Sequence, residues 1–151
     1  MIKEKSKIPN AATGLEPARG ELAVYADASV YPHATGLGAV IKDRQGNLLA
    51  WRNVALPGGM TSNEAEYHAL IFALEQARTF SPRVLQVFSD SKLVVEQMRG
   101  LYRVRQDRLR RLHQRAVALA ARFERVTFAH ISRERNQLAD AIADDAVRRK
   151  G

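Results

Sequence analysis

A carboxylate directly follows the first apolar stretch of this chain. Residues 22–26 (LAVYA) have the composition of a buried β-strand, and Asp27 comes next. Removing a charged carboxylate from water costs several kcal/mol unless a hydrogen bond or a cation compensates for the lost hydration. The fold must therefore bring a compensating group to Asp27, and this requirement restricts the topologies open to the chain.

The hydrophobic periodicity predicts one α/β domain with the element order βββαβααβα. Strands are expected at residues 21–27, 36–43, 47–56, 83–90 and 125–131. Helices are expected at about 61–78, 91–98, 105–123 and 136–150. The first three strands should form an antiparallel meander, because Gly46-Asn47 has the form of a hairpin turn. The first, fourth and fifth strands are separated by helices and should be parallel, which gives a mixed five-stranded sheet flanked by helices.

The composition indicates a basic, cysteine-free protein. Its 24 Lys and Arg residues exceed its 16 Asp and Glu residues, which gives a net charge of +8. Such a charge favours nucleic acid as a partner, and a merely basic, solvated surface is the alternative. Without cysteine there is no disulfide framework and no cysteine-based zinc site. Because neither a signal peptide nor a membrane-spanning run is found, we expect a cytoplasmic monomer with a flexible extension (1–20) and one folded domain (21–151).

Three acidic side chains are predicted to converge at one edge of the sheet. Asp27 and Asp90 each end a parallel strand, and ligands of open α/β sheets bind at the carboxyl ends of the strands. A helix-capping aspartate just before Ser91 is the alternative for Asp90. Glu66 shares the apolar stripe of its helix, whereas Glu64 lies toward the polar side and completes a T-x-x-E capping box.

Carboxylates that converge in this way repel one another unless cations neutralise them. When all the ligands are oxygen atoms, Mg²⁺ or Mn²⁺ is the expected cation. A nucleotide cofactor is not expected, because the chain has no Walker motif and GLGAV (36–40) is too short and wrongly placed for a dinucleotide fingerprint. The residues therefore favour a metal-dependent activity.

Four segments together resemble the successive motifs of type 1 ribonuclease H. They are YADAS (25–29), TSNEAEYHAL (61–70), VFSDS (87–91) and HISRERNQLAD (130–140). The resemblance covers about residues 21–149 with the same element order, and it is to the form without a basic protrusion or an N-terminal hybrid-binding domain. It implies a fourth carboxylate, Asp140, four residues after Asn136. Periodicity alone leaves Asp144 and Asp145 open on the same helix.

The resemblance implies an endoribonuclease that hydrolyses the RNA strand of RNA–DNA hybrids and leaves 5′-phosphate and 3′-hydroxyl ends. Two Mg²⁺ ions, or Mn²⁺ in their place, would be bridged by Asp27, with Glu66 and Asp90 completing one site and Asp140 the other. His130, in the loop before the last helix, would assist proton transfer or product release. A loop histidine without a catalytic role is the alternative.

Substrate contacts are also implied around these acids. Thr61 would line a pocket for a DNA phosphate, in which Gln106 replaces the usual asparagine, and Thr61 also suits the helix N-cap. The remaining residues expected to contact the RNA strand, its 2′-hydroxyls or the nearby backbone are Ala28, Ser29, Ser62, Asn63, Ser91 and Asn136. The residues expected to hold the DNA backbone, unless they form only a solvated helix face, are Arg105, Arg108 and Arg111.

Two other functions stay open on the sequence alone. A catalytically silent nucleic-acid-binding module could share this fold, although a pure binder gains little from concentrated negative charge beside phosphates. A related nuclease could instead prefer double-stranded RNA. Cleavage assays on hybrid, double-stranded RNA and DNA, with and without Mg²⁺, distinguish the three functions.

Overall fold

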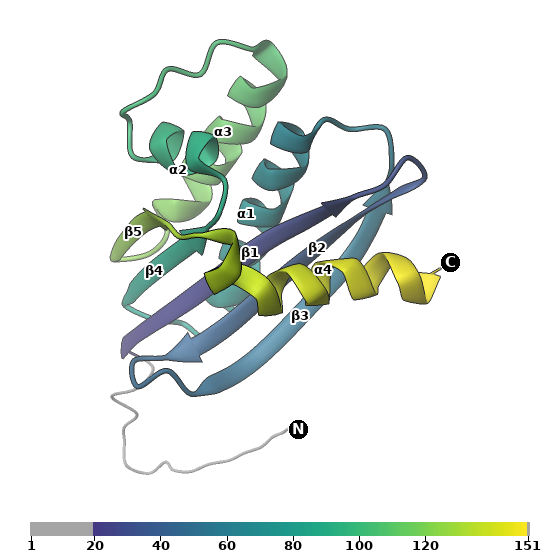
Figure 1. The fold of residues 1–151 in the computed structure, drawn as a ribbon. Coiled ribbons are helices and arrows are strands. Elements are labelled where there is room, and N and C mark those ends of the chain that lie inside the picture. Colours follow the sequence, from purple (N-terminus) through teal and green to yellow (C-terminus); the bar gives the residue numbers. More distant parts are fainter. Residues whose placement is uncertain (1–19, 151) are drawn as a thin grey trace.

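The predicted element order is confirmed in the computed structural model, which describes residues 20–150 (Figure 1). The strands are β1 (Glu21–Val30), β2 (Ala34–Asp43), β3 (Leu48–Pro57), β4 (Val84–Ser89) and β5 (Arg125–His130). The helices are α1 (Ser62–Arg78), α2 (Lys92–Met98), α3 (Asp107–Ala120) and α4 (Gln137–Lys150), with a short 3₁₀ helix, η3 (Arg133–Asn136), that was not predicted. The expected flexible extension, residues 1–20, lies outside the described residues apart from Gly20.

The five strands form one mixed sheet in the order β3-β2-β1-β4-β5. β2 pairs antiparallel with β1 and β3, while β4 pairs parallel with β1 and β5, as predicted. The β2–β3 turn is the expected hairpin, and its Gly46 has a φ of +87°, a conformation that other residues adopt only with strain. The predicted mixed five-stranded sheet topology is therefore correct.

Asp27 does not end the first strand, contrary to the prediction. β1 continues to Val30, because its β2 edge stays paired through Val30 and Thr35. Its pairing with β4 stops earlier, at Ala26 and Ser89. Asp27 is therefore the first residue of β1 beyond the end of β4, so its carboxylate still lies at the carboxyl edge of the parallel strands.

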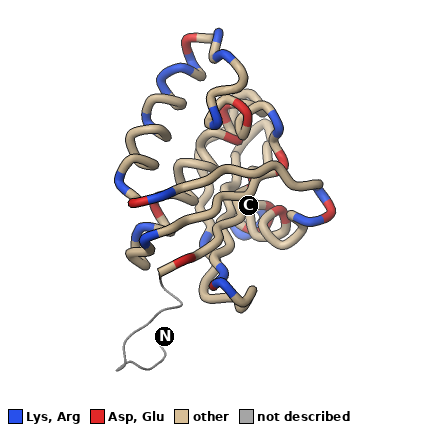
Figure 2. The backbone as a smooth tube through the Cα atoms, turned by 90° about the vertical axis from the view of Figure 1, so that its left-hand side faces the viewer, with Lys and Arg blue, Asp and Glu red and all other residues tan. Residues whose placement is uncertain are grey.

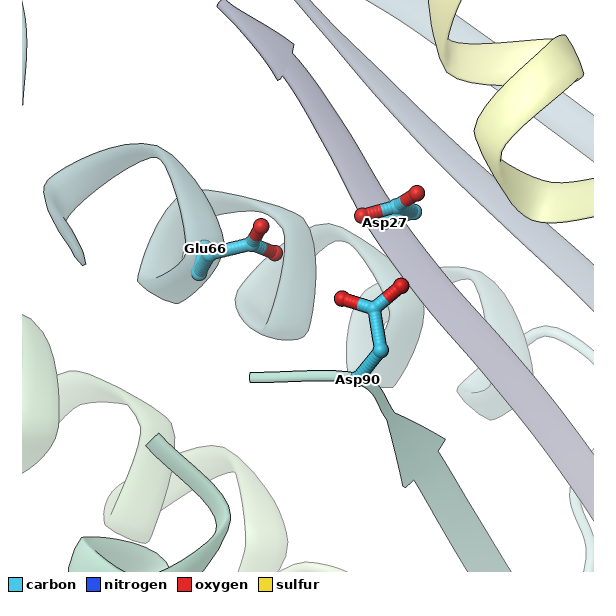
Figure 3. Close-up of side chains that lie close together, drawn as sticks. All are labelled: Asp27, Glu66 and Asp90. Atoms are coloured by element: carbon cyan, nitrogen blue, oxygen red, sulfur yellow. The ribbon is translucent and has the colours of Figure 1, made fainter. Parts of the chain in front are cut away.

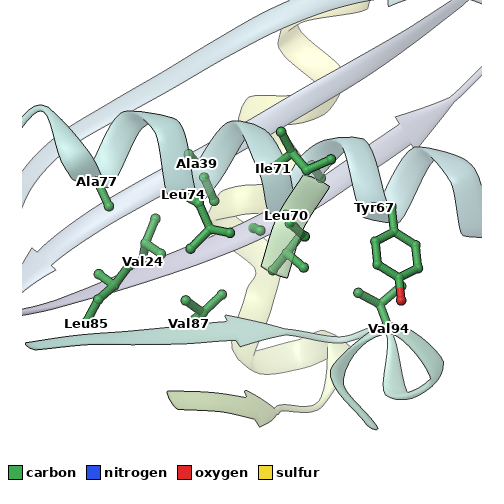
Figure 4. Close-up of a cluster of buried hydrophobic side chains, with 14 of the residues drawn as sticks. Val24, Ala39, Tyr67, Leu70, Ile71, Leu74, Ala77, Leu85, Val87 and Val94 are labelled. Atoms are coloured by element: carbon green, nitrogen blue, oxygen red, sulfur yellow. The ribbon is translucent and has the colours of Figure 1, made fainter. Parts of the chain in front are cut away.

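The main core lies between the sheet and α1 (Figure 4). Leu70 and Leu74 of α1 pack over Val24 of β1 and Val87 of β4, and all four are at most 1% exposed. Burying a side chain of this size stabilises the fold by about 1.5–3 kcal/mol. The capping box that begins α1 is present as predicted. The core thus fixes α1 against β1, which carries Asp27, and against β4, which ends just before Asp90.

The opposite face of the sheet is covered by α4, which lies directly against the backbone of β2. A β-carbon at Gly38 would come within 2.6 Å of the Ala139 carbonyl oxygen, and one at Gly36 would approach the Ala143 carbonyl oxygen even more closely. Only glycine allows such an approach between a strand and a helix. The distance of α4 from the sheet is therefore set by backbone contact rather than by adjustable side chains.

The long helix α3 is shorter than predicted at both ends. It ends at Ala120, because the amides of Arg122 and Phe123 turn back to the carbonyls of Leu119 and Ala120, and Phe123 enters the core with 8% exposure. Arg122 consequently lies beyond the helix. Among residues 20–150, no helix combines the length and apolar character needed to cross a membrane.

The glycine contact predicts a stability effect. Gly38→Ala should lower the free energy of unfolding by about 1–3 kcal/mol, because the new methyl group forces α4 away from β2. Gly20→Ala is the matched control, since its β-carbon would meet only the Arg83 side chain at 3.8 Å. Urea unfolding of both variants tests this, and equal stabilities would show that α4 is not held against the β2 backbone.

Candidate active site

Three carboxylates converge at the carboxyl edge of β1 and β4 (Figure 3). Asp27, Glu66 and Asp90 each place an oxygen within 4.8 Å of the other two. Asp27 comes from the middle of β1, Asp90 directly follows β4, and Glu66 lies in the second turn of α1. The structure therefore brings together the three acids that strand ends and helix periodicity singled out.

Burial and mutual repulsion oppose the ionised state of this cluster. Burial, followed by the charge of Asp90, raises the pKa of Asp27 to about 7, although the Ala28 amide donates to its Oδ1 at 2.9 Å. Burial, followed by the charges of Asp27 and Asp90, raises the pKa of Glu66 to about 9. Without bound cations, the carboxyl groups of this cluster therefore tend to be protonated at neutral pH.

Asp140 is the acid of α4 that faces this cluster. Its charge contributes to the raised pKa of both Asp27 and Glu66, and its side chain is exposed. The two competing aspartates are engaged elsewhere. Asp144 accepts hydrogen bonds from Ser29, Tyr31 and Arg148, and Asp145 forms an ion pair with Arg149 at 2.9 Å. The structure therefore separates Asp140, which the resemblance implied, from two alternatives that periodicity left open.

Two of the residues predicted to contact substrate form hydrogen bonds within the protein. Asn136 is 1% exposed, and its Nδ2 donates to the Ala26 carbonyl at 2.9 Å and to Asp90 Oδ2 at 3.4 Å. The Ser29 hydroxyl donates to Asp144 Oδ1 at 3.0 Å. The reason is that the start of α4 packs across β1, so side chains on this part of the strand meet the helix. Asn136 holds Asp90 and the β1 backbone rather than presenting its amide to solvent.

The segment before α4 holds one expected and one unexpected residue. His130 is exposed, but it is the last residue of β5, paired with Ser89, rather than part of a loop. Arg133, in η3, carries a positive charge that partly lowers the otherwise raised pKa of Glu66. Sequence analysis missed Arg133, and its place between His130 and Asp140, in the last motif, is the signal that could have identified it.

Several of the other expected substrate contacts line a pair of adjoining hollows beside α1. Thr61, Gln106, Asp107 and Arg108 line one of about 510 Å³. Asn63, Arg105 and Gln106 contribute to the other, of about 450 Å³. The structure thus places Thr61 beside Gln106, as the resemblance implied. Ser62 is exposed at the start of α1, and the Ser91 hydroxyl caps α2 by accepting from the Val94 amide at 3.4 Å.

Two arginines of α3 lie close to glutamates of α1. Glu64 accepts from the Thr61 amide at 2.8 Å and lies 3.9 Å from Arg108, so it has the structural role predicted for it. Arg115, further along α3, pairs with Glu75 at 3.6 Å. Figure 2 shows the basic residues spaced along α3. Arg108 and Arg111 are exposed at the end of α3 nearest the hollows.

The comparisons with known proteins agree with this geometry. The family model described as "Reverse transcriptase-like" matches residues 26–146, which is most of the chain. The structure of RNase H1 from Halobacterium salinarum is 33% identical, covers 85% of this chain and 98% of its own, and superposes with a TM-score of 0.81. The chain belongs to the type 1 ribonuclease H family. The family predicted from the four motifs is therefore confirmed.

Two further relatives show how much of each protein the similarity covers. LC11-RNase H1, solved in complex with an RNA/DNA hybrid, is 32% identical with a TM-score of 0.79 and covers 85% of this chain and 98% of its own. "Bifunctional protein Rv2228c" of Mycobacterium tuberculosis is 37% identical over 116 residues, which are 77% of this chain and 32% of that protein. The chain spans about a third of the length of that curated relative.

The acidic cluster suits the divalent metals that this family generally uses. All the converging donors are carboxylate oxygens, which are the ligands that hard divalent cations prefer. The raised pKa values of Asp27 and Glu66 show that the charges lack sufficient compensation from the protein. A bound cation would supply that compensation, so the residues present fit a metal site.

These pKa values predict how stability depends on pH without metal. An acid whose pKa is raised by folding binds more protons in the folded state, so the free energy of unfolding falls as pH rises between the two pKa values. That window runs from 3.8 to about 7 for Asp27 and from 4.5 to about 9 for Glu66. In EDTA, the protein should therefore lose stability between pH 5 and pH 9.

Substitutions assign this loss to the cluster. Asp27→Asn should flatten the fall in stability below pH 7, and Glu66→Gln should flatten it across the whole range up to pH 9. At pH 8 the Asp27→Asn variant should be more stable than the wild type. Glu64→Gln should leave the profile unchanged, because the pKa of Glu64 is lowered by the Thr61 amide. Urea unfolding across this pH range measures the effect. Profiles of Asp27→Asn and Glu66→Gln that match the wild type would contradict it.

Proposed function

We propose that this chain is a metal-dependent endoribonuclease that hydrolyses the RNA strand of RNA–DNA hybrids. The observation that carries the proposal is the convergence of Asp27, Glu66 and Asp90 at one sheet edge, with Asp140 of α4 facing Asp27. The hybrid-bound structure of LC11-RNase H1, which shares this fold at 32% identity, supports the choice of substrate. The products are expected to carry 5′-phosphate and 3′-hydroxyl ends.

Each acid has a distinct role in the proposed mechanism. Divalent cations, when bound, activate the attacking water and stabilise the leaving oxygen at phosphorus. Asp27, in the centre of the cluster, would bridge two such ions, most simply Mg²⁺, with Mn²⁺ able to substitute. Glu66 and Asp90 would complete one site, and Asp140 would complete the other. The role of His130 as an aid to proton transfer stays a prediction. His130 is exposed and pairs across β4 and β5 with Ser89, the residue before Asp90.

The surroundings of the cluster support a duplex substrate. The exposed side chains of Ser62 and Asn63 at the start of α1 are proposed to reach the RNA strand and its 2′-hydroxyls. A phosphate of the DNA strand is proposed to bind in the hollow that Thr61, Gln106 and Arg108 line. Because phosphate contacts carry no sequence information, cleavage should show little sequence preference.

A cleavage assay tests the function directly. Labelled RNA–DNA hybrid, double-stranded RNA and double-stranded DNA are incubated with the protein in Mg²⁺ or in EDTA. Cleavage of the hybrid alone, only with Mg²⁺, is the expected result. Binding without cleavage would identify a catalytically silent module, and faster cleavage of double-stranded RNA would identify the alternative nuclease.

The two glutamates of α1 provide a matched pair for this assay. Glu66→Gln should reduce kcat by more than about a hundredfold, since supporting residues around a metal site typically cost 10–100-fold and a ligand costs more. Glu64→Gln should remain within about twofold of the wild type, because Glu64 only caps α1 and pairs with Arg108. Steady-state kinetics on the hybrid measure both. Equal losses would remove Glu66 from the proposed ligand set.

The arginines at the start of α3 should govern the salt dependence of binding. Arg108→Ala with Arg111→Ala should raise KM, leave kcat nearly unchanged and flatten the slope of log K against log salt by about one to two units. The control pair, Arg122→Ala with Arg125→Ala, removes the same charge beyond the far end of α3 and on β5. Equal flattening in both pairs would show an effect of net charge rather than of this surface.

A further inference from the structure

The contacts between α4 and the sheet repeat once along β1. In the first row, Asp27 pairs with Gly38 across the β1–β2 ladder, and Gly38 lies under the Ala139 carbonyl of α4. In the second row, Ser29 pairs with Gly36, which lies under the Ala143 carbonyl. From the first row to the second, β1 advances by two residues, or about 6.8 Å, and α4 advances by four residues, or about 6 Å. Because these two lengths are similar, the helix and the strand meet in nearly the same way at both rows.

The acids of α4 follow the same repeat. Asp140 comes directly after Ala139 in the first row and faces Asp27, and Asp144 comes directly after Ala143 in the second row and faces Ser29. Asp140 and Asp144 lie about one turn apart in the same continuous helix, so their positions relative to the sheet are linked. A shift of Asp144 along or away from β1 is therefore also a shift of Asp140.

The two rows differ in whether the side chains of β1 and α4 repel or attract each other. The first row sets the carboxyl group of Asp27 against that of Asp140, and the two repel each other when both are ionised, which is the state that can bind a metal. The second row is attractive: Asp144 Oδ1 accepts from the Ser29 hydroxyl at 3.0 Å and from the Tyr31 hydroxyl, while Arg148 donates to Oδ2. Hydrogen bonds to a charged carboxylate are stronger than neutral ones. The second row thus opposes the force that would push the first row apart.

We propose that Ser29, Tyr31 and Asp144 form a latch that positions Asp140 against Asp27 before metal binds. The proposal rests on the proposed function, because it treats Asp140 as a metal ligand. It gives Ser29 the role of a positioning residue rather than of a substrate contact. It also gives a role to Tyr31, just after β1, to which the sequence motifs assigned none.

A separate attachment of α4 supplies the control. On the β3 side, Asn53 donates to the Ile142 carbonyl at 2.8 Å, and Arg149 donates to Asn53 at 3.2 Å and pairs with Asp145. These contacts also fasten α4 to the sheet, but they lie on the side of the helix away from β1. Asp145→Asn therefore removes one carboxylate of α4 without touching the latch.

The test is a calorimetric titration of the free protein with Mn²⁺. Ser29→Ala with Tyr31→Phe, which keeps the Asp144 carboxylate, should weaken Mn²⁺ binding by about tenfold. Tyr31→Phe alone removes a single oxygen and should show a smaller loss, so the proposal stays testable if the double variant folds poorly. Ser29→Thr, which keeps the hydroxyl, and Asp145→Asn should both bind Mn²⁺ within about twofold of the wild type.

A double-mutant cycle shows whether the latch acts through Asp140. In an Asp140→Asn background, adding Ser29→Ala and Tyr31→Phe should cause no further loss of Mn²⁺ affinity. In the cleavage assay, the latch variant should need about tenfold more Mg²⁺ for half-saturation, with KM for hybrid unchanged. A purely structural role would instead lower the melting temperature in EDTA and leave Mn²⁺ affinity intact.

Three results would overturn the latch. They are wild-type Mn²⁺ affinity in the double variant, a loss that persists in the Asp140→Asn background, and a raised KM with unchanged Mn²⁺ affinity. The last would make Ser29 a substrate contact. A wild-type protein that binds Mn²⁺ but leaves hybrid intact would refute the proposed function, while the affinity comparison would still decide the latch.

Discussion

The charge of Asp27 in the middle of the sheet is the constraint that the rest of the site accommodates. The residue is 5% exposed and lies beside Asp90, so neither water nor the hydrogen bond donated by the Ala28 amide balances its charge. A protein that carries such a cluster is less stable than one with neutral side chains in its place. That loss is tolerable because the apolar core under α1 stabilises the same strands, and it leaves the site ready to take up cations.

Rigid attachment keeps the repelling acids together. Each of the four comes from a different part of the fold: β1, the second turn of α1, the end of β4 and the first turn of α4. Side-chain packing holds α1, and direct contact with the β2 glycines holds α4. Because none of the four is on a long loop, they cannot relax apart by local movement, and the geometry of the site depends on the positions of whole elements.

The distribution of charge gives the molecule two different responses to nucleic acid. The chain carries a net charge of +8, and exposed arginines lie along α3. These attract a polyanion at a distance. The acidic cluster repels the same polyanion at close range until cations occupy it. Under the proposed function, substrate binding and metal binding would therefore be coupled at the cluster, whereas the arginine surface would act in either condition.

The sequence by itself determined the element order, the sheet topology and three of the four acids, because these follow from short-range periodicity and from carboxylates that adjoin apolar strands. It placed Glu66 rather than Glu64 in the site, since helix geometry decides which side chains share a face. Periodicity alone could not choose Asp140 over Asp144 and Asp145, and only the resemblance to ribonuclease H singled it out. The choice depends on the rotation of α4 against β1, where the β2 glycines contact the helix and Ser29 and Tyr31 donate to Asp144. Nor could the sequence show that Asp27 lies inside β1 or that Asn136 is buried. Both depend on which edges of β1 are covered, and only the assembled sheet and helices decide that.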